Sequence, residues 1–166
     1  MKKRLLILVL VLAALTVVLS GCATEEPPSD EPKKNAYFTD IDENLLEDIR
    51  LTVTPTILTD GAQDITTTIT NTSDKNNYIF GVYVYLEVLD GGKWVEYPLL
   101  ENVAWTMEAY LCEPGSTKDM PGHIQGLYGN LPAGRYRIAK DFQLTDSDWH
   151  PKETKGYAVA EFEVRP

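Results

Sequence analysis

The sequence predicts an all-β domain folded as a sandwich of about seven short strands. Apolar and polar residues alternate over several short segments, which is the pattern of a half-buried strand. The stretch from Thr52 to Thr72 is rich in threonine, which favours strands over helices. Turn-forming pairs such as Asp90-Gly91 and Pro114-Gly115 separate these segments.

Residues 1–21 have the pattern of a secretory signal peptide. Lys2, Lys3 and Arg4 precede an apolar run from Leu5 to Leu19, which is short for a bilayer span. We therefore expect this segment to direct export.

The end of the run, Leu19-Ser20-Gly21-Cys22, resembles the lipobox of bacterial lipoproteins. The resemblance implies cleavage before Cys22 and attachment of diacylglycerol to its sulfur. Two or more acyl chains give stable membrane anchoring. We therefore expect an extracytoplasmic protein held on the cell membrane by lipid. The alternatives are an ordinary signal peptide with a chance cysteine and an uncleaved anchor.

After the anchor, residues 22–36 are rich in Glu, Pro and Asp and predict a flexible tether. Residues 37–166 are left for the folded domain. At its start, Asp42 is expected to cap a short helix through Leu45 and Leu46.

The remaining elements follow from the alternation, taken in chain order. Strands are expected within residues 50–54, 63–71, 80–88, 93–97, 107–113, 116–127, 135–142 and 157–164. The third is the strongest, with an apolar face formed by Phe80, Val82, Val84, Leu86 and Val88. Asp90-Gly91-Gly92 predicts a hairpin turn after it.

The segment from Leu131 to Tyr136 resembles the tyrosine corner of Greek-key sandwiches, through Leu131, Gly134 and Tyr136. There a tyrosine hydroxyl bonds to nearby backbone, and Gly134 is expected to free the backbone for the turn. A core tyrosine with no special bond is the alternative.

Five segments in this order resemble the bacterial immunoglobulin-like domains of secreted lipoproteins. They are residues 69–73, 83–87, 92–95, 111–116 and 131–138. The resemblance covers about residues 49–165 and implies an immunoglobulin-like Greek-key β-sandwich at the cell surface, with no catalytic residues to transfer. A weaker similarity is to the intracellular proteinase inhibitor family, which implies a protease-binding loop instead.

The charge and the chemically reactive residues of the chain argue against several classes of function. The chain has 25 Asp+Glu against 15 Lys+Arg, which argues against nucleic acid as a partner. We expect no enzyme, because no nucleophile, base and orienting group are set out together. We expect no metal or cofactor, because His123, His150 and Cys112 have no ligand-like spacing. A calcium ion held by scattered loop carboxylates, such as Asp146 and Asp148, is the alternative to solvated acidic turns. Cys112 is expected to be a buried, inert thiol.

Non-covalent binding of a surface protein or glycan remains the expected role. If Tyr136 faces inward, Tyr83, Tyr85, Arg135 and Arg137 share the outer face of a sheet, and Tyr and Arg often anchor interfaces. The same residues also form cross-strand pairs that simply stabilise a sheet. The three tryptophans, Trp94, Trp105 and Trp149, leave a carbohydrate-binding accessory domain as a further alternative.

Overall fold

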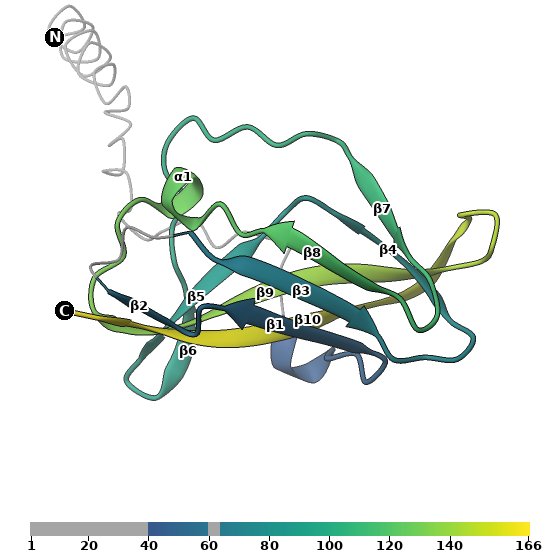
Figure 1. Cartoon of the computed structure of the whole chain (residues 1–166), viewed down its shortest axis with the longest axis horizontal. Helices are drawn as coiled ribbons and strands as arrows, with labels where there is room; N and C mark the ends of the chain where they lie inside the picture. Colours follow the sequence, from purple (N-terminus) through teal and green to yellow (C-terminus); the bar gives the residue numbers. More distant parts are fainter. Residues whose placement is uncertain (1–39, 60–63) are drawn as a thin grey trace, which may run out of the picture. The chain divides into compact units, whose positions relative to one another are not determined.

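The computed structural model describes residues 40–59 and 64–166, and β-strands dominate this part of the chain (Figure 1). Its strands are β1 (Ile49–Thr54), β2 (Ile57–Thr59), β3 (Thr66–Asn71), β4 (Asn77–Gly81), β5 (Tyr85–Asp90), β6 (Lys93–Glu96), β7 (Ala109–Cys112), β8 (Thr117–Pro121), β9 (Gly134–Thr145) and β10 (Pro151–Arg165). Two short helices accompany them, η1 (Ile41–Glu43) and α1 (Ile124–Tyr128).

The smaller sheet has the strand order β1-β3-β8 and is antiparallel throughout. Alternation decides its two faces. Leu51 of β1 is paired with Ile69 of β3, and both are buried. The next pair, Thr52 and Thr68, points to the opposite face of the sheet. There the Thr68 hydroxyl donates to Asp119 over 2.6 Å. Strands β1 and β3 are the strands expected within residues 50–54 and 63–71.

The larger sheet has the order β2-β10-β9-β4-β7, with β5 and β6 joined through β9. Its long central strands, β9 and β10, run beneath the smaller sheet in Figure 1. The connections from β3 to β4 and from β8 to β9 pass from one sheet to the other. The protein is therefore an all-β, immunoglobulin-like sandwich, as the sequence predicts.

One apolar core fills the space between the sheets. Leu51 and Ile69 of the smaller sheet belong to the same buried cluster as Tyr136, Ile138 and Phe162 of the larger one. The rings of Tyr136 and Phe162 stack with their centroids 5.5 Å apart. Packing across both sheets holds the sandwich together, because a single sheet has no other place to bury its apolar face.

Three elements differ from the sequence-based expectations. The expected strand over residues 80–88 is two strands, β4 and β5, with Val82 in the break between them. Strand β2, which pairs in parallel with the end of β10, was not expected. Strand β10 begins at Pro151 rather than at residue 157, so it forms a long hairpin with β9.

Some predictions lie outside the described residues. The signal peptide, the lipobox residues Leu19, Ser20, Gly21 and Cys22, and the tether fall in residues 1–39, so the structure says nothing of them. Among the described residues, neither helix has the length and apolar character needed to cross a bilayer.

Candidate binding face

The residues predicted to form a binding face lie on the outer face of the larger sheet or beside it. In β9, Tyr136 and Ile138 point into the core, so Arg135, Arg137 and Ala139 point to the opposite side. Antiparallel pairing sets Glu87 of β5 opposite Arg137. The alternation that builds the core therefore also gathers charged side chains on the outside.

Arg137 is the centre of this face, and it is buried. Its Nε donates to the carboxylate of Glu87 in a short hydrogen bond, and its guanidinium lies 4.8 Å from the ring of Trp94. The exposed fraction of the Arg137 side chain is only 5%, and that of Glu87 is 9%. A buried charge requires such partners, because desolvation otherwise disfavours it.

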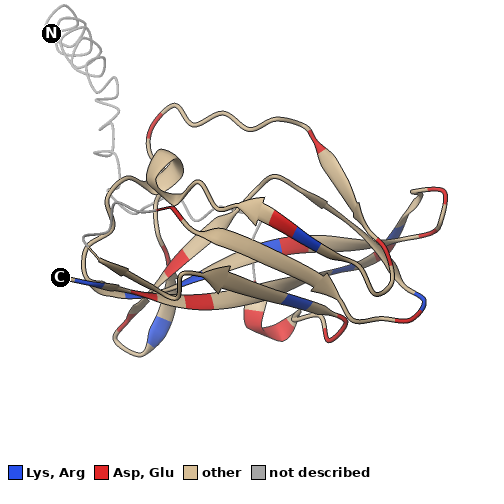
Figure 2. Ribbon diagram, viewed as in Figure 1, with Lys and Arg blue, Asp and Glu red and all other residues tan. Residues whose placement is uncertain are grey.

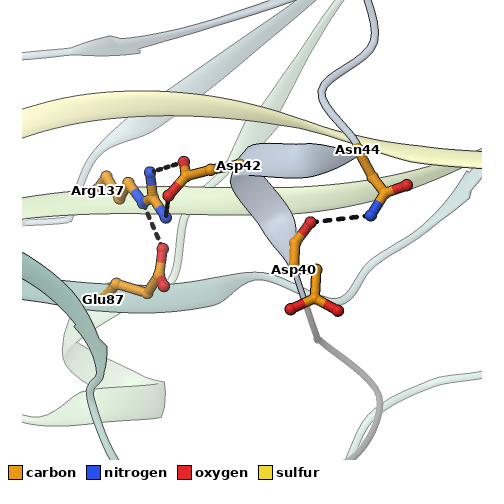
Figure 3. A network of polar contacts seen from close by, with 5 residues as sticks. All are labelled: Asp40, Asp42, Asn44, Glu87 and Arg137. Atoms are coloured by element: carbon orange, nitrogen blue, oxygen red, sulfur yellow. Dashed lines mark hydrogen bonds and ion pairs between the residues drawn. The ribbon is translucent and has the colours of Figure 1, made fainter.

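A second carboxylate reaches Arg137 from a different part of the chain. Asp42 belongs to η1, and its Oδ1 accepts a hydrogen bond from Nη1 over 2.5 Å (Figure 3). Its Oδ2 lies 3.3 Å from Nη2, so the contact is a two-point pair. Burial lowers the pKa of Arg137, but the hydrogen bonds that it donates to Glu87 and Asp42, with the attraction of both charges, outweigh burial and raise the pKa overall.

The segment that carries Asp42 lies across the face. We call residues 40–46 the strap. Ile41 is buried with Tyr85 and Ala139 in a second, smaller cluster, separate from the main core. Farther along, the Leu46 N–H donates to the Tyr157 carbonyl, and the Tyr157 N–H donates to the Asn44 carbonyl, each over 2.8 Å. The strap is therefore joined to the sheet by apolar, ionic and backbone contacts.

The strap corrects two expectations. Asp42 does not cap a helix. It lies inside η1 and pairs with Arg137. Tyr85 and Arg137, expected to be exposed on the outer face, are 5% and 4% exposed, because the strap covers them. Arg135 is exposed and pairs with Glu161 over 2.6 Å, and Tyr83 is half-buried.

The three tryptophans lie in different settings. Trp94 stacks on Arg137, and the ring of Trp105 lies 4.3 Å from that of Tyr83. Trp149 lies in the β9–β10 turn with a positive φ of 67°. Trp94 and Trp105 therefore contribute to the surroundings of the candidate face, whereas Trp149 is 48% exposed at the end of the hairpin.

The tyrosine-corner residues lie at the entry to β9. The Tyr136 hydroxyl donates to the Pro132 carbonyl over 2.8 Å, and Leu131 is buried in the core. Gly134 does not have a positive φ, so its expected role in the turn differs from what is observed. A Cβ on Gly134 would lie 3.3 Å from the Tyr136 ring, so this glycine leaves room for the ring instead.

Sequence reasoning missed one buried cation. Lys140 is 1% exposed, and its ammonium donates to the carbonyls of Gly81 and Tyr83 over 2.5 and 2.8 Å. These carbonyls lie at the break between β4 and β5. Burial lowers the pKa of Lys140 to about 8. The sequence does contain a sign of this burial, because Lys140 alternates in phase with Tyr136, Ile138 and Phe142, which face the core. A lysine at such a position must find hydrogen-bond acceptors for its ammonium group.

Other sequence candidates are placed as follows. Cys112 is buried, as expected, and burial raises the pKa of its thiol. In the described part of the chain, no three His, Cys, Asp or Glu side chains are grouped so as to hold a metal ion. An open groove of about 250 Å³ lies beside the end of the strap, lined in part by Leu45, Arg50 and Val159.

Acidic and basic residues are interspersed along the strands and loops of the domain (Figure 2). The outer face of the larger sheet combines both signs with aromatic rings, and it holds a segment of its own chain through a carboxylate and an apolar side chain. These features make the outer face of the larger sheet the candidate binding face of the sandwich.

Residues 46–160 match the family model described as bacterial Ig-like domain. The chain belongs to this family, which agrees with the resemblance seen in the sequence.

No curated protein matches the chain. Among solved structures, it is similar to a chain from a structure titled "Chaperone-tip adhesin complex is vital for synergistic activation of CFA/I fimbriae biogenesis". The identity is 14% and the TM-score 0.36, over 68% of this chain. The protein spans only 55% of that chain's length.

Proposed function

We propose that the protein is a lipid-anchored component of the bacterial cell envelope whose immunoglobulin-like domain binds a protein or glycan non-covalently outside the cytoplasm. The observation that carries the anchoring is the position of Leu19-Ser20-Gly21-Cys22, directly after a cationic start and a short apolar run. The acidic, proline-containing tether that follows gives the domain reach above the membrane.

Metabolic labelling with palmitate in the producing bacterium tests the anchor. The full chain is expected to incorporate label and to fractionate with membranes, whereas Cys22→Ser is expected to lose both. Cys112→Ser is the matched control, because it removes the other cysteine, which is buried in the domain. Equal labelling of wild type and Cys22→Ser contradicts the anchor.

The binding role is supported by the mixed aromatic and charged outer face, where Arg135 and Tyr83 border the covered centre. Tyrosine and arginine are enriched among residues that dominate binding energy. Quantitative capture of envelope proteins and glycans by the full chain tests this role, with Arg135→Ala and Tyr83→Ala against Arg50→Ala. Arg50 is an exposed arginine of β1, in the other sheet. Equal capture by all variants contradicts the choice of face.

A further inference from the structure

The strap has the contacts of a bound peptide. Ile41 is 5% exposed and belongs to a buried cluster with Tyr85 and Ala139, while Asp42 makes a two-point pair with Arg137. Asn44 and Leu46 then form backbone hydrogen bonds with Tyr157 in a parallel bridge. The backbone bonds of Asn44 and Leu46 are those of a peptide added to a sheet edge, and the short helix before them supplies the side-chain anchors.

A glycine in β10 of the larger sheet leaves room for the backbone of the strap. A Cβ on Gly156 of β10 would lie 2.7 Å from the Asn44 carbonyl oxygen and 2.7 Å from Cγ of Leu46. Gly156 has no positive φ that would otherwise call for glycine. The missing side chain therefore serves the close approach of the strap where it passes β10, on the core-facing side of that strand.

The centre of the site requires a carboxylate. Glu87 accepts a hydrogen bond from Nε of Arg137, and the two amino groups of Arg137 point to Asp42 of the strap (Figure 3). If the strap leaves, the ion pair with Glu87 remains and the two amino groups of Arg137 are opened to water. The vacated face then offers two parallel N–H donors, which match a planar carboxylate better than water does.

The strap is also easy to release. Its helix η1 has only three residues, and Asp40, which precedes it, has a left-handed φ of 58° without a side-chain cap. The Asp42 side chain is 65% exposed, so water reaches the outer side of its ion pair. Ile41 is the buried residue of η1, and segments with few buried residues open at low free energy.

We propose that the outer face of the larger sheet is a peptide-binding site that the strap occupies in the isolated protein. The partner is an acidic peptide in which an apolar residue directly precedes an Asp or Glu, since Ile41-Asp42 shows which chemistry the site accepts. The strap competes with this partner, so the apparent affinity is the affinity of the open site multiplied by the fraction of molecules in which the strap is released. This inference rests on the proposed binding function and adds the site, the ligand class and its regulation.

Anisotropy of a labelled peptide with the sequence DIDENLLE tests the site in the full detergent-solubilised chain. Asp42→Lys opposes Arg137 and releases the strap without changing the face. This variant is expected to bind the peptide at least about tenfold more tightly than wild type, because its site is open. Ile41→Ser releases the strap by removing the apolar anchor, and it serves if Asp42→Lys does not fold.

Two controls separate the site from general stickiness. Adding Gly156→Val to Asp42→Lys is expected to abolish binding, because the new side chain occupies the peptide backbone position. A peptide with Lys in place of its second Asp, DIKENLLE, is expected not to bind. Binding of both peptides alike, or no gain from either strap variant in a folded protein, overturns the proposal. If palmitate labelling and envelope capture persist in that case, the proposed function stands without this site.

Discussion

The Tyr136 hydroxyl illustrates how a single bond fixes the junction between the two sheets. It donates to the Pro132 carbonyl from a ring that is packed in the core. Tyr136→Phe is expected to lower the free energy of unfolding by about 1 kcal/mol, since it removes one partly buried hydrogen bond. Urea titration measures this change.

Tyr110→Phe provides the comparison. Its hydroxyl donates to Glu108 at an exposed site, where water replaces the lost bond. We expect a change of only a few tenths of a kcal/mol there. Equal effects of the two substitutions would show that the bond to Pro132 has no special structural weight.

Lys140 gives the protein a distinctive pH dependence. Its pKa is lowered to about 8 by burial, whereas a lysine in the unfolded chain titrates near 10.4. Between these values the unfolded state binds more protons than the folded state, so the contribution of Lys140 to stability rises with pH. Below about pH 8 both states hold the proton and this contribution is constant.

The test compares urea unfolding of wild type and Lys140→Met at pH 7.5, 8.5 and 9.5. The difference in unfolding free energy between the two proteins is expected to grow with pH in favour of wild type. Taking the difference cancels other groups, such as Cys112, whose raised pKa has the opposite sign. Lys155→Met, at an exposed position of β10, is the control and should keep the wild-type slope.

At the scale of the residue, the sequence predicts most inward-facing positions but not what covers the outer ones. Alternation places Tyr136 and Ile138 inside and Arg137 outside, and the structure agrees. The alternation does not reveal that Ile41 and Asp42, far away in the sequence, lie over the face that contains Arg137. Alternation describes a strand and its sheet, whereas coverage depends on a tertiary contact.

Among the elements, the β5–β6 hairpin depends most on its turn residues. Gly91 and Gly92 have φ values of 53° and 82°, as the Asp90-Gly91-Gly92 signal predicts. Gly92→Ala is expected to destabilise the domain by about 1 kcal/mol, because L-residues adopt positive φ at a cost. Thermal or urea unfolding measures the change.

A second glycine supplies a matched control. Gly126 lies in α1 without a positive φ, and nothing is within 4 Å of its would-be Cβ. Gly126→Ala is expected to be neutral or to stabilise the protein by up to about 1 kcal/mol, because alanine favours helix. Loss of stability at Gly126 equal to that at Gly92 would contradict the role of backbone conformation.

The element boundaries show where sequence patterns stop being informative. Residues 80–88 keep their alternation through the break between β4 and β5, so the pattern predicts one strand. The break is supported by Lys140 from another strand, which has no local signature. Strand β2 has three residues, too few for periodicity, and it forms because β10 offers an edge.

On the scale of the whole molecule, the sandwich was predictable because its pattern recurs in segment after segment. Each half-buried strand must hide one face, and several such strands in one chain are satisfied by two sheets packed together. The candidate face was only partly predictable. Its residues follow from alternation, but the strap that closes it combines an isolated Ile-Asp pair with a distant glycine, Gly156.

A shared core also predicts that the two sheets unfold together. Ile69 in β3 is fully buried and belongs to the cluster that includes Tyr136 and Phe162 of the larger sheet. Ile69→Ala is expected to cost about 2–5 kcal/mol by leaving a cavity, and Val95→Ala, at a 45% exposed strand position, about 0.5 kcal/mol. Tryptophan fluorescence reports mainly on the larger sheet around Trp94 and Trp105, whereas far-ultraviolet circular dichroism reports on both sheets. The two midpoints should fall together in Ile69→Ala, and their separation would mean that the larger sheet keeps its structure without the smaller one.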